Sequence, residues 1–305
     1  MQVGHSLAVA LSLFPCFLFC SEDRPLYIRV VTDSSTNVLD SYLQRLRIVE
    51  TPAIVNFGAE SFLNKVELSV EEFYHRLAAA GKLPTTSQPT PRQFLDAYQH
   101  LANEGAAEIV AVCVSGRMSG TLNSAIIAAQ EAPVPVHTWD TESASLGAGW
   151  QAIAAAEMAQ EGVGSATLLE RLTAIRQRMQ TAATPATLRN LVASGRVPRL
   201  RGNIGDLLNV KPILSMINGM LEPVDQARGR RQALARMVER IAAAVGERPV
   251  RVGIAHANIA QEAAEFLAAV RARLNAVDEI VTDIGPALAA LAGPGILILA
   301  AYTVE

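Results

Sequence analysis

The sequence is poor in aromatic residues and has no excess of positive charge. Aromatic residues make up 5% of the 305 positions, and 26 Lys and Arg stand against 29 Asp and Glu, for a net charge of −3. Proteins that neutralise nucleic-acid phosphates need a basic surface, so no nucleic-acid partner is expected. Half of the residues are apolar, which favours a globular core of aliphatic helices and strands.

Cysteine and histidine are also scarce. The three cysteines, Cys16, Cys20 and Cys113, show neither the spacing of a metal site nor that of a disulfide framework. The five histidines are scattered, and none pairs with an acidic residue at metal-ligand spacing. We therefore expect no metal and no cofactor, and we interpret Cys113, inside an apolar run, as a small buried hydrophobe.

The first twenty residues are apolar but lack the basic start and small-residue cleavage site of a signal peptide. Pro15 interrupts them, and the stretch is short for a membrane-spanning helix. We interpret residues 1–26 as an upstream extension or misread start; an export or anchor signal is the less favoured alternative. The folded protein is expected to begin near Tyr27, to be cytoplasmic and to contain no membrane span.

Strands and helices alternate from Tyr27 to about residue 160. Short apolar runs near residues 27–32, 107–114 and 134–139 are typical of buried strands. Between them, Ser69 and Thr90 each begin a helix at capping-box spacing, and Pro91 takes a first helical position. This alternation predicts a parallel sheet covered on both faces. The glycine-rich residues 161–166 mark a boundary, so residues 27–162 form the predicted N-terminal α/β/α domain.

The pattern changes in the second half of the chain. A helix, an Arg- and Gly-rich stretch and a hairpin turning at Asn218-Gly219 precede two further helices and two apolar strands. These features predict a C-terminal α+β domain over residues 163–305 with a mixed sheet and antiparallel pairing. The fold class is therefore α/β with two domains.

Hydroxyl-rich segments follow the predicted strands. They comprise Asp33 with Ser34, the stretch from Ser115 to Thr121, and Asp140-Thr141; a further polar segment, residues 85–88, precedes the helix at Pro91. Ligands of open α/β sheets bind at the carboxyl ends of strands, and helix N-termini attract anions. A cradle for a carboxylate or phosphate is one interpretation, and ordinary helix capping is the other.

Eight motifs, in this order and spacing, resemble one family. They are "VVTDSST", "TSQPTPRQF", "SGRMSGTLNSA", "WDTESASLGAG", "SGRVPRLRGNIGDLLNVKPIL", "ARGRRQAL", "VGIAHAN" and "AGPG". Together they are similar to the DegV family of bacterial lipid-binding proteins. The resemblance covers residues 27–303.

The resemblance implies the EDD fold and a carrier that is not an enzyme. A DegV-like protein would bind one long-chain fatty acid, with its carboxylate at the domain junction and its acyl chain in an apolar tunnel. Members of the fatty acid kinase system present this acid to a separate kinase subunit. The resulting acyl phosphate enters phospholipid synthesis.

The resemblance also assigns binding residues. Thr86 of "TSQP" and Ser119 of "SGT" are expected to hydrogen-bond the carboxylate. Neighbouring secondary candidates are Ser87, Gly120, Thr121 and Ser115. Arg228 of "ARGRR" matches a basic position near the headgroup, with a solvated surface arginine as the alternative.

One position departs from the family. Leu291 of "ALAGPG" stands where the resemblance implies a histidine, and no histidine follows His256. In kinase-linked members that histidine is thought to assist phosphoryl transfer. The departure therefore weakens the expectation of a kinase partner while leaving carboxylate binding intact.

The alternative function is a phosphoryl- or acyl-transfer enzyme that uses the same loops. A serine nucleophile would need a nearby base, and His137, the histidine nearest to these loops, lies inside an apolar strand pattern. A nucleotide-binding Rossmann enzyme is disfavoured because "DSST" follows the first strand in place of G-x-G-x-x-G. The sequence therefore favours the carrier.

Overall fold

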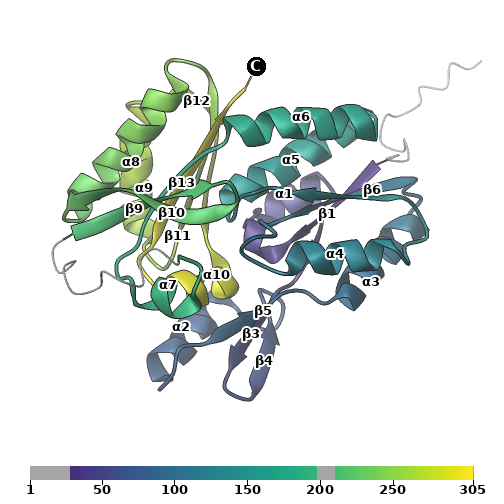
Figure 1. Ribbon diagram of the computed structural model, residues 1–305, viewed down its shortest axis with the longest axis horizontal. Coiled ribbons are helices and arrows are strands. Elements are labelled where there is room, and N and C mark those ends of the chain that lie inside the picture. Colours follow the sequence, from purple (N-terminus) through teal and green to yellow (C-terminus); the bar gives the residue numbers. More distant parts are fainter. Residues whose placement is uncertain (1–27, 198–209, 305) are drawn as a thin grey trace, which may run out of the picture.

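A computed structural model describes residues 28–197 and 210–304. It is an α/β protein with one sheet in each half of the chain and a small third sheet below them in Figure 1. The predicted extension, residues 1–26, and part of the Arg- and Gly-rich motif lie outside the described residues.

The N-terminal sheet is parallel, as predicted, with the strand order β2-β1-β6-β7. Its residues alternate between two covered faces. Val30, Val110 and Val112 pack toward α5, whereas Val31 and Ala111 belong to a cluster with α3 and α4. The elements of this half are β1 (Ile28–Asp33), η1 (Ser34–Thr36), α1 (Asp40–Arg45), β2 (Val49–Thr51), α3 (Pro91–Asn103), β6 (Glu108–Cys113), α4 (Thr121–Ala129), β7 (Val136–Asp140) and α5 (Leu146–Gln160).

Local sequence signals start the helices where they were predicted. At α3 the Thr90 hydroxyl accepts from the Gln93 backbone N–H, and the Gln93 side chain accepts from the Thr90 N–H, which completes the capping box. At α2 (Val70–Ala79) the Ser69 hydroxyl accepts from the Glu72 N–H. Cys113 is fully buried in the core beside α3, in agreement with its interpretation as a small hydrophobe.

A three-stranded sheet that the sequence did not predict lies between β2 and α3 in the chain. Its order is β4-β3-β5, all antiparallel. The strands are β3 (Ile54–Phe57), β4 (Glu60–Leu63) and β5 (Thr85–Ser87). Strand β5 covers most of the polar segment that precedes α3, where no strand was predicted. Three residues are too few to show a period of two, and β5 is extended because it pairs with β3.

The C-terminal sheet is mixed, as predicted, with the order β10-β9-β8-β13-β11-β12. Only β11 and β12 run parallel among the described pairs. The predicted hairpin turns at Asn218 and Gly219, both with positive φ. The elements are α6 (Ser165–Arg178), β8 (Gln180–Thr184), α7 (Arg189–Ser194), β9 (Val210–Ile217), β10 (Met220–Arg228), α8 (Arg230–Val245), β11 (Val250–His256), α9 (Ala260–Arg271), β12 (Ala276–Asp283), α10 (Gly285–Ala292) and β13 (Leu297–Thr303).

Helix α5 lies between the two large sheets. It contacts β1 and β6 on one side and β11 and β13 on the other. A helix covered on all sides must be apolar all round, and α5 is alanine-rich with 13 buried residues. Gly253 of β11 allows the close approach, since a Cβ built there would lie 2.8 Å from Cβ of Leu146. Helix α5 therefore belongs to the packing of both halves. The domain boundary after residue 162 remains a prediction.

Candidate ligand-binding site

A polar pocket opens where the strand-end loops meet α10. Both of the charged residues that line it among the described residues are arginines, Arg117 and Arg196. Its polar lining also includes Ser35, Thr86, Ser87, Gln88, Ser119 and Thr121. Such a lining attracts an anion.

Thr86 and Ser119 come to this pocket from different elements. Thr86 lies in β5, opposite Val55 of β3. Ser119 lies just before α4, and its hydroxyl is 2.8 Å from that of Thr121. The short strand and the helix start thus bring together two hydroxyls that are separated in the sequence.

The secondary candidates Thr121, Ser87 and Gly120 also line the pocket but differ in burial and hydrogen bonding. Thr121 is almost fully buried and its backbone N–H donates to Oγ of Ser119, so it orients that side chain. Ser87 is exposed at the pocket, where its hydroxyl accepts from the Asn56 amide. Gly120 lies at the start of α4 and also lines the pocket.

Asp33 and Ser34 are buried and brace the loops instead of lining the pocket. Asp33 accepts from the backbone N–H groups of Ser35 and Val114. Burial raises the pKa of Asp33, and these hydrogen bonds oppose the shift. The Ser34 hydroxyl accepts from the backbone N–H of Ala53 and from the side chain of Asn64.

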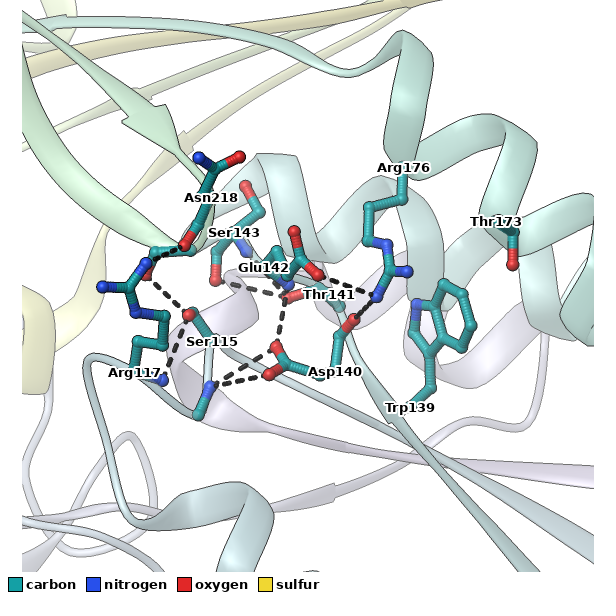
Figure 2. Close-up of polar contacts among 12 residues, drawn as sticks. Ser115, Arg117, Trp139, Asp140, Thr141, Glu142, Ser143, Thr173, Arg176 and Asn218 are labelled. Atoms are coloured by element: carbon teal, nitrogen blue, oxygen red, sulfur yellow. Dashed lines mark hydrogen bonds and ion pairs between the residues drawn. The ribbon is translucent and has the colours of Figure 1, made fainter.

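Ser115 connects the two halves of the molecule. Figure 2 shows its hydroxyl and the Arg117 side chain directed toward the hairpin turn. The Ser115 Oγ donates to the carbonyl of Gly219 at 2.7 Å, and Arg117 donates to the carbonyl of Asn218 at 2.7 Å. These four residues are called the hairpin clasp below. Ser115 lines neither the polar pocket nor the cavity described next.

An apolar cavity with an empty volume of about 670 Å³ adjoins the polar pocket. Its walls come from both halves of the chain, with Ala144 and Ser145 facing residues of β8, β9, α7 and α10. The residues that line both spaces are Met118, Ala144, Arg196, Leu288 and Leu291. The polar pocket therefore lies directly beside the cavity, and Leu291 belongs to the lining of both.

The loop after β7 is held rigid beside this junction. The Arg176 guanidinium lies 4.5 Å from the centre of the Trp139 ring and donates to the carbonyl of Asp140. It also pairs with Glu142 at 3.3 Å. The Asp140 carboxylate accepts from the N–H groups of Glu142 and Gly116, which ties this loop to the one that carries Ser119.

A basic residue near the pocket was expected at Arg228. Arg228 ends β10, is exposed, and lines neither space; its backbone N–H donates to the Gln232 side chain. Arg196 and Arg117 line the pocket instead. In the quoted motifs, Arg117 and Arg196 each follow a Ser-Gly pair. This shared pattern could have marked them as binding candidates.

The family model described as "Uncharacterised protein, DegV family" matches residues 27–303. The chain belongs to the DegV family. A DegV domain-containing protein of Streptomyces coelicolor is 32% identical over 277 residues, covering 89% of this chain and 96% of that protein. A DegV domain-containing protein of Deinococcus radiodurans is 33% identical over 272 residues, covering 88% and 95%.

Solved DegV structures share the fold. A DegV lipid-binding protein of Thermotoga maritima is 28% identical, with a TM-score of 0.84 over 91% of this chain and 99% of that one. A DegV family protein of Thermus thermophilus, described by its fatty acid binding, is 29% identical, with a TM-score of 0.84 over 91% of this chain and 100% of that one. The DegV fold in this chain therefore has the predicted α/β architecture.

Within residues 28–197 and 210–304, no group of three or more His, Cys, Asp or Glu side chains is placed to bind a metal ion. None of the helices in those ranges is long and apolar enough to cross a membrane.

Proposed function

We propose that this DegV protein binds one long-chain fatty acid, with the carboxylate in the polar pocket and the acyl chain in the apolar cavity. The observation that carries the proposal is that the polar pocket and the apolar cavity share part of their lining. A pocket lined by arginines and hydroxyls, which attract an anion, lies directly beside a cavity walled mainly by alanine, leucine and isoleucine. A fatty acid has the same division between a charged end and an apolar chain.

The carboxylate needs several donors, because an unpaired charge away from water is costly. The proposed donors are the hydroxyls of Thr86 and Ser119, which both line the pocket. The N-terminus of α4 adds partial positive charge next to Ser119. Arg196 and Arg117 add full positive charges that favour the ionised acid.

The acyl chain is stabilised by leaving water. The cavity is walled mainly by alanine, leucine, isoleucine and methionine side chains, and apolar walls of this kind are typical of small-molecule sites. Each buried methylene contributes about 0.8 kcal/mol. A long chain therefore supplies most of the binding free energy, and the polar pocket selects the headgroup.

The proposed role is carriage of the acid. Leu291 stands where the family resemblance implies a histidine, and it lines the junction of pocket and cavity. Leucine can neither donate a hydrogen bond to the carboxylate nor transfer a proton near neutral pH, whereas histidine can do both. We propose that the bound acid is a poor substrate for a fatty acid kinase.

A transferase or hydrolase at the same loops is less well supported. The described residues that line the two spaces include serine and threonine but no histidine or carboxylate. A serine nucleophile without a base stays protonated and weak. His137 lies in β7 and is engaged with Glu108 at 2.6 Å. Lining of this kind favours binding over catalysis.

Two measurements on the full chain test the proposal. Mass spectrometry of an organic extract of the purified protein should detect a long-chain fatty acid. Calorimetric titration of the delipidated protein with palmitate should give one site per chain. No palmitate binding, or a nucleotide in the extract in place of a fatty acid, would refute it.

A further inference from the structure

The end of the Gln88 side chain occupies the space next to the Cα of Gly120. The backbone of Gly120 has φ −74° and ψ 2°, which any residue adopts. A Cβ built on it would lie 2.7 Å from Nε2 and 3.0 Å from Cδ of Gln88. The Gln88 amide therefore rests on the bare backbone of the loop that follows Ser119.

The sequence around Gln88 directs its side chain to the same side as Thr86. Residues two apart in an extended segment point to the same face. Thr86 lies in β5, and Gln88 follows the strand directly and precedes Pro89, which restricts it to the extended region. Ser87, between them, is hydrogen-bonded to Asn56. Thr86 and Gln88 both line the polar pocket, and Ser87 lines it as well.

The amide of Gln88 is free to bind a ligand. It makes no hydrogen bond within residues 28–197 and 210–304, and Gln88 is exposed at the pocket. A carboxylate offers about four acceptor sites. The neighbouring Ser119 hydroxyl already shares a hydrogen bond with Thr121, so the hydroxyls alone leave acceptor sites unfilled.

We propose that Gln88 is a further headgroup-binding residue, whose side-chain N–H group donates to the carboxylate alongside Thr86 and Ser119. This inference rests on the proposed function and deepens it. The amide is neutral and donates two hydrogens, so it favours an ionised acid over an uncharged headgroup of the same chain length. Gly120 leaves room for the amide because it has no side chain.

The test compares myristic acid with 1-tetradecanol, both delivered from cyclodextrin, on the full chain and four variants. Gln88→Leu should weaken myristate binding about 10- to 150-fold, the range for loss of one charge-assisted hydrogen bond. Tetradecanol binding should change less than about twofold. Gln88→Glu keeps the shape but adds a charge, so its loss of myristate affinity should be larger at pH 8 than at pH 5.

Gly120→Ala should reproduce the effect of Gln88→Leu, because its methyl group displaces the amide. The double variant Gly120→Ala/Gln88→Leu should then be no weaker than Gln88→Leu alone, since both changes remove one interaction. Additive losses, equal losses for acid and alcohol, or unchanged myristate affinity in Gln88→Leu would each overturn the role of Gln88. Wild-type protein that binds no myristate would overturn the proposed function itself.

Discussion

The Ser115 hydroxyl donates a 2.7 Å hydrogen bond to the carbonyl oxygen of Gly219, 104 residues further along the chain. A side chain at Gly219 would be strained, because its φ is +76° and a Cβ there would lie 2.7 Å from Oγ of Ser115. The loop that leads to Ser119 is thus joined to the β9–β10 hairpin. The same hairpin supplies Leu214, Met216 and Leu221 to the cavity wall.

Ser115→Ala should speed release of a bound fatty acid and lower the free energy of unfolding by about 1–2 kcal/mol. The reason is that the Gly219 carbonyl loses its buried donor and one link of the hairpin clasp is broken. Stopped-flow transfer of a fluorescent fatty acid to vesicles measures the release. The control is Ser61→Ala, which removes an exposed hydroxyl bonded within the β3–β4 hairpin. Equal release rates for both variants would contradict a role in retention.

Thr86→Ala and Ser119→Ala should each weaken palmitate binding by about 1–3 kcal/mol, because a charged acceptor loses a donor. Calorimetric titration measures the change. Thr85→Ala is the matched control, since Thr85 lies beside Thr86 in β5 and does not line the polar pocket. If all three variants bind equally well, the carboxylate is held elsewhere.

Leu291→His should raise phosphorylation of the bound acid with little change in affinity. The histidine ring would stand where the polar pocket meets the cavity and could donate to the carboxylate. The measurement is a coupled assay with a fatty acid kinase from the same source, with both proteins loaded with palmitate. Brisk turnover on wild-type protein would show that the histidine is dispensable here.

Ala183→Leu should shorten the acyl chain that the protein accepts. Ala183 lies in β8 and lines the apolar cavity, so a larger side chain takes up volume that a long chain needs. Affinity for palmitate should fall about tenfold or more, as expected when extra atoms must be accommodated. Octanoate affinity, measured on the same protein, should be nearly unchanged. Equal losses for both acids would argue against a chain in this part of the cavity.

Glu50→Gln should change how stability depends on pH. Burial raises the pKa of Glu50 to about 7, although Lys65, 3.6 Å away, opposes the shift. The pKa of an unfolded glutamate is about 4.3, so between these values the folded state binds more protons than the unfolded state. The stabilising contribution is therefore complete below about pH 4.3 and is lost as pH rises through 7.

Urea unfolding at pH 5 and pH 8 measures this effect. Wild-type protein should lose about 2–3 kcal/mol more than Glu50→Gln between the two values. The exposed pair of Arg92 and Asp96 offers the control Asp96→Asn, which should follow wild type. Parallel pH profiles for wild type and Glu50→Gln would contradict the raised pKa.

Signals within a few residues of one another determined much of the fold. The capping box of Thr90 and Gln93, the Asn218-Gly219 turn and the apolar strand runs depend on local contacts, so they could be predicted in place. Thr86 and Ser119 could be assigned only through the family resemblance. That resemblance depends on the order of eight motifs in the linear sequence.

Tertiary structure alone decided which of these residues share a space. Strand β5 exists because β3 pairs with it, and no pattern within three residues encodes that partner. Arg117, Arg196 and Arg228 look alike in the sequence, yet only the first two line the pocket, because chain segments far apart converge there. Asp33 and Ser34 were binding candidates like Ser119, but both are buried and hydrogen-bond the surrounding loops. The sequence shows whether each side chain can donate, accept or carry charge. Long-range packing determines which other residues it meets.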